Sequence, residues 1–377
     1  MQIIRKIEQD IIQKLSLESS KVIIIYGARQ VGKTTLVNSI IKKTGYKTLY
    51  LNGDDIADAK RIIGRGKEKL AGLIAGYELL FIDEAQKIED IGTSLKILHD
   101  QFRNLKIIVT GSSSLELANN LKEPLTGRCQ KYLLYPISFL ELSTQHTEIE
   151  LERKLEDFLI YGSYPDTINI ANNQDKRGYL TDLSSSYLYR DVLELENIRH
   201  SQKIRDLLEL LALQIGSEVS YHEIGQKLGL SSTTIVNYID LLEKSFVLQT
   251  LRGFSRNLRK EISKKPKIYF CDLGIRNSII GNFADINKRT DSGAIWENFL
   301  FVERIKRNHY LKHICSNYFW RTYTGAELDY IEEYDGELFG YEFKQTKTVK
   351  SPKLWNEEYG QNYQCINKDN FLEFVKK

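Results

Sequence analysis

Residues 21–40, KVIIIYGARQVGKTTLVNSI, decide the fold. The apolar run over 22–26 predicts a buried strand, and the amphipathic pattern from Thr34 onward predicts a helix. The loop between them, residues 27–34, is an intact G-x-x-x-x-G-K-[ST]. A glycine-rich turn before a helix also arises by chance, but this one lies between the strand and the helix that phosphate binding requires. The stretch therefore predicts a binding site for a nucleoside triphosphate.

The residues of this loop have separate expected tasks. Their backbone N–H groups turn inward around a diphosphate, and the helix start adds the positive end of its dipole. We expect the Lys33 ammonium to reach the β- and γ-phosphates and the Thr34 hydroxyl to complete the shell of a Mg²⁺ ion. The expected cofactors are thus ATP and Mg²⁺. The expected nucleotide-binding residues are Gly27, Ala28, Arg29, Gln30, Val31, Gly32, Lys33, Thr34 and Thr35.

Composition and cysteine spacing limit the class of protein. The chain has 377 residues, enough for two or three domains, and its apolar fraction of 42% is ordinary for globular proteins. Its formal net charge is only +3, so any affinity for nucleic acid must come from local basic clusters. The four cysteines lie far apart, which argues against a disulfide framework or a zinc site. Without a secretion signal or an apolar run of bilayer length, we expect a cytoplasmic protein with no membrane partner.

A second motif, LLFIDE at residues 79–84, places two acids at the end of an apolar run. Such a run is typical of a central parallel strand whose carboxyl end points its acids at the nucleotide. We expect Asp83 to hold Mg²⁺, directly or through water, and Glu84 to polarise the attacking water. Alone, the motif fits equally a strand that enters a solvated turn. Its position about fifty residues after the glycine-rich loop favours the catalytic interpretation.

Two further stretches offer residues that act on the γ-phosphate. The strand expected over 106–110 ends at Thr110, and either Thr110 or Ser112 can sense that phosphate and orient the water. Their alternative is a plain turn. Arg128 precedes a strand expected over 129–136, and we expect it to act in trans on a neighbouring subunit's γ-phosphate. Its alternative is an ordinary surface arginine.

The order of elements predicts the fold class. Short apolar strands, including 48–52, alternate with helical sequence, and the phosphate loop follows the first strand. This order predicts an α/β fold with a doubly wound parallel sheet.

The motifs GARQVGKTT, LLFIDEAQ, VTGSSS, LTGR and YPIS together resemble a group of prokaryotic AAA+ ATPases. In that group the C-terminal half is a domain of unknown function with a helix-turn-helix and a nuclease-like tail. The resemblance covers essentially the whole chain and implies assembly into a homo-oligomeric ring or partial ring, but it supplies no substrate. It divides the chain into an AAA+ P-loop core, a helical lid, a winged helix and a nuclease-like domain, at 1–145, 146–200, 201–285 and 286–377. Within the lid, Arg190 followed by Asp191 is more simply a surface ion pair than a phosphate contact.

The region from Lys203 onward has the pattern of a helix-turn-helix. Ser220 and Ser231 are good N-caps for two helices, and residues 228–230, LGL, give the tight turn between them. The second helix would then be the reading helix, with Ser232, Thr233, Thr234 and Asn237 as small polar contacts.

A β-wing is expected behind the reading helix, and its tip is densely basic. Duplex or structured DNA is therefore the expected partner, through contacts with phosphates. A protein-interaction module and a solvated hairpin are the alternatives. The basic residues are Arg252, Arg256, Arg259, Lys260, Lys264, Lys265 and Lys267, against the single acid Glu261.

The C-terminal tail combines an expected helix over 293–307 with two strands, 326–331 and 338–344, joined by a hairpin. Glu342 and Lys344 point to one face of their strand because they are two residues apart. Asp329 can approach from the neighbouring strand and Glu297 from the helix. Three carboxylates that hold Mg²⁺ or Mn²⁺, with a lysine that positions water, are what metal-assisted phosphodiester hydrolysis uses.

This constellation resembles the PD-(D/E)XK nuclease-like fold, in which Asp329, Glu342 and Lys344 match the signature and Glu297 the usual helix acid. Leu328 stands where that family has proline. The alternative is a half-buried hairpin with salt bridges.

Two functions stay open from the sequence. One is an ATPase that handles DNA in defence, repair or mobile-element biology, with a C-terminal module that either cleaves DNA with a metal ion or binds it without cleavage. The other is an ATP-gated switch whose C-terminal half binds a protein partner or a DNA site without catalysis.

Overall fold

The computed structural model describes residues 3–18, 20–64, 66–112, 125–188, 201–256, 265–323 and 325–377. The chain forms two compact units. The first, the N-terminal unit, comprises residues 2–136 with 244–246, and the second, the C-terminal unit, comprises residues 137–243 and 247–377. Predictions made for Arg190, Asp191 and the loop from Arg259 to Lys264 lie outside the described residues.

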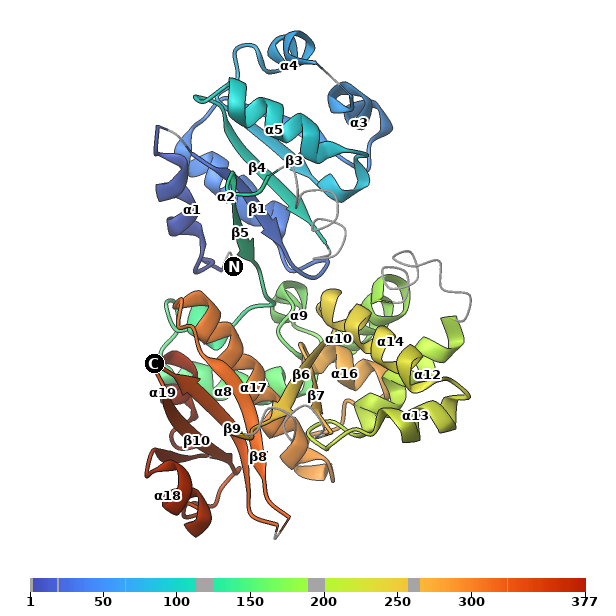
Figure 1. Cartoon of the computed structure of the whole chain (residues 1–377), viewed down its shortest axis with the longest axis vertical. Helices are drawn as coiled ribbons and strands as arrows, with labels where there is room; N and C mark the ends of the chain where they lie inside the picture. The colour runs from blue at the N-terminus through green and yellow to red at the C-terminus, as the bar shows by residue number, and fades with distance from the viewer. Residues whose placement is uncertain are drawn as a thin grey trace. The chain divides into compact units, whose positions relative to one another are not determined.

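A five-stranded parallel sheet forms the centre of the N-terminal unit, as the alternating pattern predicts (Figure 1). Its order is β2-β3-β4-β1-β5, so β1, the strand before the glycine-rich loop, lies beside β4, and β3 lies on the other side of β4. Every pairing in it is parallel, which brings the carboxyl ends of all five strands to one edge. The strands are β1 (Val22–Tyr26), β2 (Thr48–Asn52), β3 (Leu79–Asp83), β4 (Lys106–Gly111) and β5 (Cys129–Leu133).

Helices cover both faces of this sheet. One face buries alternate strand residues such as Ile24, Ile82 and Val109 against the apolar sides of the helices after β2 and β3. The helix after the glycine-rich loop lies on the opposite face (Figure 1). The helices are α1 (Glu8–Leu15), α2 (Lys33–Thr44), α3 (Ile56–Ile62), α4 (Lys67–Ile74), the 3-10 turn η1 (Ala85–Lys87) and α5 (Ile91–Gln101).

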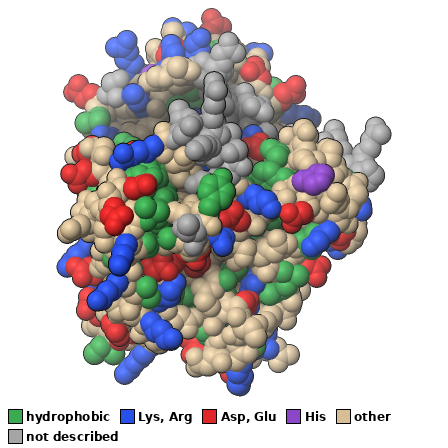
Figure 2. Space-filling view, turned by 60° about the horizontal axis from the view of Figure 1, so that its bottom comes forward, with side chains coloured by type: hydrophobic (Ala, Val, Ile, Leu, Met, Phe, Trp, Pro, Cys, Tyr) green, Lys and Arg blue, Asp and Glu red, His purple; other side chains and the backbone are tan. Residues whose placement is uncertain are grey.

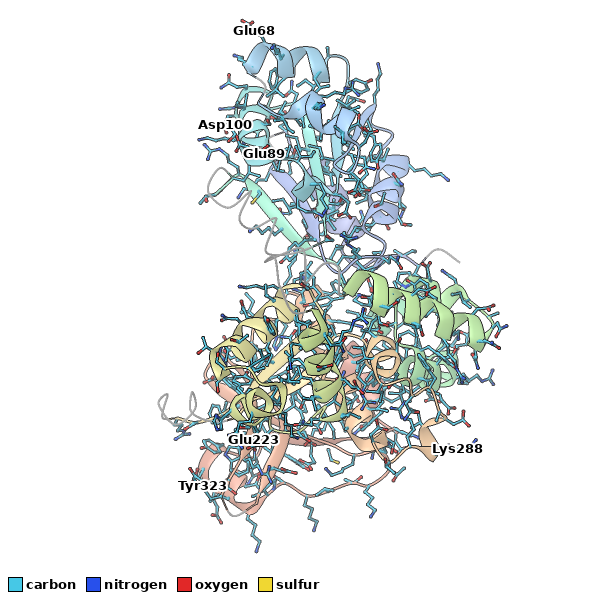
Figure 3. The ribbon with its side chains drawn as sticks, turned by 90° about the vertical axis from the view of Figure 1, so that its right-hand side faces the viewer. Glu68, Glu89, Asp100, Glu223, Lys288 and Tyr323 are labelled. Carbon is cyan, nitrogen blue, oxygen red and sulfur yellow. The ribbon has the colours of Figure 1, made fainter. Side chains whose placement is uncertain are left out.

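The C-terminal unit contains a six-stranded mixed sheet of order β11-β10-β9-β8-β6-β7. The hairpin expected between the last two predicted strands is confirmed, because β9 and β10 pair antiparallel around a turn at Asp335 and Gly336, both with positive φ. Tyr323 is fully exposed between β8 and β9 (Figure 3). The strands are β6 (Leu248–Gly253), β7 (Lys267–Phe270), β8 (Ser316–Arg321), β9 (Glu327–Tyr334), β10 (Glu337–Phe343) and β11 (Tyr363–Ile366).

Helices make up the rest of this unit. The longest, α17, carries a nearly continuous set of buried side chains and packs against the last helix, α19. The helices are α7 (Phe139–Leu142), α8 (Glu148–Tyr161), α9 (Pro165–Asn169), α10 (Asn173–Asp182), the π-helical turn η2 (Leu183–Leu188), α12 (Ser201–Leu213), α13 (Tyr221–Leu228), α14 (Ser232–Lys244), α16 (Leu273–Ile279), the 3-10 turn η3 (Ile286–Lys288), α17 (Ser292–Tyr310), α18 (Lys353–Tyr359) and α19 (Phe371–Lys376).

The predicted tight turn joins α13 to α14. Ser220 and Ser231 cap the two helices by accepting backbone N–H bonds from Glu223 and Thr234, so both predicted caps are confirmed. A Cβ on Gly225 would lie 2.6 Å from the Leu230 carbonyl oxygen, so the turn folds back onto the first helix more closely than a larger residue allows.

None of the helices within the described ranges is long and apolar enough to cross a membrane. All four cysteines are free thiols.

Candidate nucleotide site and candidate acid cluster

The glycine-rich loop follows β1 and leads directly into α2, the context that the sequence predicts. Gly27 has a φ of 151° and Gly32, the N-cap of α2, a φ of 92°. A Cβ on Gly27 would lie 2.1 Å from the carbonyl oxygen of Leu134, just beyond the end of β5. This close approach leaves no room for a side chain at Gly27. The absence of a side chain lets the loop backbone pack against the end of β5.

Lys33 is buried, and its ammonium donates to the carbonyl oxygens of Gly27 and Ala28 at 3.0 and 2.9 Å. Arg5 connects the loop to the segment after β5, because its guanidinium donates to the carbonyl oxygens of Val31 and Tyr135. Arg5 could not be predicted from the sequence, because nothing in the pattern before α1 distinguishes it from its neighbours. The ammonium is thus already inside the curve of the loop, where phosphate oxygens would meet it.

Asp83 lies at the end of β3 between two hydroxyl groups. Thr34 Oγ1 donates to Asp83 Oδ2 at 2.8 Å, and Thr110 Oγ1 donates to Asp83 Oδ1. A hydroxyl and a carboxylate oxygen brought together at the helix start are hard oxygen ligands of the kind that Mg²⁺ prefers. Thr34 and Asp83 therefore fit a Mg²⁺ ion that accompanies a nucleotide.

Glu84 follows Asp83 with a left-handed backbone, φ 48°. Its Oε2 accepts a bond from Gln86 Nε2 at 2.5 Å, and the same nitrogen lies 3.0 Å from Ser112 Oγ. Thr110 also accepts the Glu84 backbone N–H at 3.3 Å. The structure thus brings all four predicted residues at the ends of β3 and β4 together, and it adds Gln86, to which the motif LLFIDEAQ alone assigns no role.

Arg128 lies at the amino ends of the strands, opposite the edge at which the glycine-rich loop lies. Its carbonyl oxygen accepts the N–H of Val22, the first residue of β1, so it is separated from the loop by the length of that strand, roughly 13 Å. Its guanidinium donates to Asp100 on α5 at 2.8 Å (Figure 3). Hydrogen bonds from Arg128 and His99 lower the pKa of Asp100 to about 2. Arg128 is therefore away from its own nucleotide, and its role in trans stays a prediction.

The four tail residues converge in the C-terminal unit. Lys344 Nζ donates to Glu342 Oε1 at 2.5 Å and lies 3.8 Å from Asp329 Oδ2. Asp329 Oδ2 also accepts the Phe343 backbone N–H at 2.8 Å. Glu297 approaches from α17, as predicted, and the other Glu342 oxygen, Oε2, is buried without a hydrogen-bond partner.

A fifth charged residue, Lys267 from β7, lies in the same cluster. Its ammonium is 2.8 Å from Glu297 Oε1 and 3.8 Å from Asp329 Oδ1. Tyr269, two residues on, donates to the same Glu297 oxygen at 2.6 Å. The assignment of Lys267 to a basic wing tip is therefore wrong, because β7 is buried along its whole length and the Lys267 side chain is only 8% exposed.

Burial and neighbouring charges shift the protonation of this acid cluster. Burial raises the pKa of Glu297. Burial and the Asp329 carboxylate raise the pKa of Glu342 to about 7, although Lys344 opposes them. Burial alone would lower the pKa of Lys267, but Glu297 and Asp329 raise it, so the ammonium stays charged. Within the described ranges, no group of three or more His, Cys, Asp or Glu side chains has a metal-binding arrangement.

The remaining basic residues of the expected wing have different surroundings. Arg252 is exposed on β6. Arg256 lies over the ring of Tyr359 at 5.0 Å, and Lys265 pairs with Glu223 at 3.0 Å (Figure 3). Basic and acidic side chains are interspersed on the face drawn in Figure 2. On α14, the predicted contacts Ser232, Thr233 and Asn237 are exposed, and Thr234 is half-buried beside its cap.

Comparison with known families supports the class of the N-terminal unit. Residues 19–143 match the family described as an AAA domain. Residues 152–286 and 292–365 match two domains of unknown function, DUF8612 and DUF4143. The N-terminal unit is thus similar to AAA domains, and the C-terminal region matches families that have no assigned function.

Relatives extend over most of the chain. Rv2008c, an uncharacterized protein of Mycobacterium tuberculosis, is 27% identical over 338 residues, which cover 88% of this chain and 72% of that protein. MJ1544 of Methanocaldococcus jannaschii, also uncharacterized, is 28% identical over 84% of this chain and 73% of its own length. Among solved structures, Thermotoga maritima RuvB, described as a Holliday junction branch migration motor, shares 17% identity over 66% of this chain and 89% of that chain. Its TM-score of 0.33 supports no transfer of function.

Proposed function

We propose that this chain is a Mg²⁺-dependent ATPase whose C-terminal unit binds DNA and responds to the nucleotide held by the N-terminal unit. One observation carries the ATPase assignment. Thr34 Oγ1 and Asp83 Oδ2 meet at 2.8 Å beside a loop whose lysine is already turned into its curve. The AAA domain match over residues 19–143 supports the same assignment.

Each residue at the strand ends has a part in this proposal. The Lys33 ammonium and the loop N–H groups bind the phosphates, and Thr34 and Asp83 hold the Mg²⁺, which neutralises charge on the phosphate oxygens. Glu84 orients the attacking water. Thr110 fixes the Asp83 carboxylate, and Ser112 acts through Gln86, so the two predicted sensors are positioning residues in this scheme.

The DNA assignment rests on the region from α12 to β7. Three helices with a tight turn before the last one, followed by the antiparallel pair β6–β7, support the winged helix on which this assignment depends. The exposed polar side chains of α14, Ser232, Thr233 and Asn237, suit contact with a groove of duplex DNA. The alternative is a C-terminal unit that binds a protein partner. It fits the same structural features, but its binding would not depend on phosphate charge.

Equilibrium titrations test both halves of the proposal. Wild-type protein should bind ATP with Mg²⁺, and Lys33→Ala should lose most of that affinity. Exposed Lys87→Ala is the matched control, since Lys87 lies outside the loop, and it should bind as the wild type does. No binding of ATP by the wild type would end the ATPase assignment.

Binding of duplex DNA should weaken steeply with salt, since phosphate contacts release counterions. A plot of the logarithm of the DNA-binding constant against the logarithm of salt concentration gives the salt slope. In Arg252→Ala this slope should become shallower by about one. A wild-type affinity that ignores salt would favour the protein-binding switch.

A further inference from the structure

The acid cluster of the C-terminal unit contains more positive charge than a hydrolytic metal site needs. Three carboxylates, Glu297, Asp329 and Glu342, meet two ammonium groups, Lys267 and Lys344. Only Lys344 belongs to the nuclease-like signature. Lys267 comes from a different strand, β7, at the far edge of the same sheet from β11.

The Lys267 ammonium lies near charged or aromatic side chains from three elements, α17, β9 and β8. Its ammonium is 2.8 Å from Glu297 on α17 and 3.8 Å from Asp329 on β9, and it lies 5.4 Å from the centre of the buried Phe319 ring on β8. A carboxylate pair and an aromatic face together suit a retained cation. On the backbone, Lys267 pairs with Leu251 in β6 and bridges to Glu218, so β7 is held on both sides.

This ammonium pairs with two of the three carboxylates that a divalent metal would need, Glu297 and Asp329. A Mg²⁺ ion requires about six oxygen ligands in near-octahedral geometry. Glu297 Oε1 is already used by Lys267 and Tyr269, and Asp329 Oδ2 by the Phe343 N–H. A metal shared by Glu297 and Asp329 would lie next to Lys267 Nζ, where two positive charges would repel each other in a buried site.

We infer that Lys267 is the resident cation of this cluster: its ammonium stands between Glu297 and Asp329 in place of a divalent metal, so the cluster is a metal-free ion-pair lock that joins β7, α17 and β9. The chain's own residues therefore do not fit the metal that the nuclease-like resemblance implies. The C-terminal unit then binds its partner without metal-dependent cleavage. This inference does not depend on the ATPase, because it concerns side chains of the C-terminal unit alone.

Binding of Mn²⁺ to nucleotide-free protein, counted by electron paramagnetic resonance, tests the inference. The wild type should bind no Mn²⁺ at the cluster at micromolar concentrations. Lys267→Ala should gain one bound Mn²⁺, because the carboxylates lose their internal cation. The affinity of this variant for Mn²⁺ should exceed that of the wild type by at least about tenfold. Adding Asp329→Asn to that variant should remove the gained ion, which assigns it to the cluster and not to the glycine-rich loop.

The matched control is Lys265→Ala, which removes a lysine two residues away whose partner, Glu223, is exposed. It should leave Mn²⁺ binding unchanged. Circular dichroism verifies that each variant is folded, and Lys267→Met replaces the alanine variant if that one does not fold.

Two results would overturn the inference. The first is a wild-type protein that binds Mn²⁺ tightly and loses the ion in Asp329→Asn. The second is a folded Lys267 variant that gains no ion. The wild-type titration needs no substitution in Lys267, so the first result is decisive even if both variants are unstable.

Discussion

Gln86 positions another side chain of the candidate nucleotide site through hydrogen bonds. Its amide nitrogen joins Glu84 Oε2, on the expected water-orienting carboxylate, to Ser112 Oγ just beyond the end of β4. Gln86 is buried, so its position is set by packing as well as by these bonds. It therefore fixes where the Glu84 carboxylate points before any water is engaged.

Replacement of Gln86 by alanine should lower kcat for ATP hydrolysis by about 10-fold to 100-fold, because a misplaced Glu84 orients water poorly. The affinity for ATP should stay the same, since Gln86 does not belong to the loop. Steady-state kinetics and nucleotide titration measure the two quantities separately. Gln101→Ala, on the exposed end of α5, serves as the control. A fall in affinity with unchanged kcat would show that Gln86 has a different role.

Sequence patterns reveal some of these residues and conceal others for a physical reason. The loop, Thr34 and Asp83 lie in strand–loop–helix patterns that are local in the chain, so spacing alone predicts them. Arg5, Asp100 and Lys267 act through partners distant in sequence, and their roles depend on which strands become neighbours. Lys267 follows a basic run, a pattern that predicts a place in the wing, and only the pairing of β7 places it in the core.

Among the helices and strands, too, local patterns are predictable from the sequence and pairings between distant segments are not. The parallel sheet and the β9–β10 hairpin were predictable because apolar runs and alternation are local signals. The parallel pairing of β6 with β8 was not, since it joins the region after α14 to the tail. That pairing places β7, and with it Lys267, in the same sheet as the tail strands.

The start of α17, which carries Glu297, is fixed by an ion-pair group. Asp291 accepts bonds from Arg276 and Arg289, and Arg276 is only 1% exposed. Burial alone would raise the pKa of Asp291, but the hydrogen bonds from Arg289 and Arg276 outweigh it and lower that pKa to about 2. Because the folded protein binds this proton less readily than the unfolded chain, Asp291 stabilises the fold above pH 3.8, and the contribution disappears as pH falls toward 2.

Asp291→Asn should therefore lower the free energy of unfolding at pH 7 by about 1 kcal/mol, less than the full pKa difference would give because Asp291 keeps some contact with solvent. The difference from the wild type should stay constant between about pH 5 and 7 and shrink below about pH 4. Urea unfolding at several pH values measures it. Asp285→Asn breaks an exposed pair with Lys288 and should have no measurable effect (Figure 3). A difference that grows on acidification would contradict this account of Asp291.

At the scale of the whole molecule, Arg128 connects the ATPase proposal to assembly. It lies at the opposite edge of the sheet from its own loop and is held by Asp100. In a homo-oligomer such an arginine can complete a neighbour's site, which the isolated chain cannot do for itself.

Mixing two inactive variants tests this role. Arg128→Ala keeps its own Glu84 but supplies no arginine, whereas Glu84→Gln supplies Arg128 but has no active water-orienting residue. Mixed oligomers would contain sites with both groups, so an equimolar mixture should hydrolyse ATP faster than either variant alone. A mixture no faster than its components, despite verified co-assembly, would remove Arg128 from the mechanism.

The most direct measurement of the central claim is ATP turnover and ATP binding by Glu84→Gln, compared with the wild type and with Glu89→Gln. Glu89 is an exposed acid in the same segment (Figure 3). We predict that Glu84→Gln binds ATP as tightly as the wild type and loses at least about 100-fold in turnover, while Glu89→Gln is unaffected. Full turnover by Glu84→Gln, or a wild type that does not hydrolyse ATP, would contradict the account.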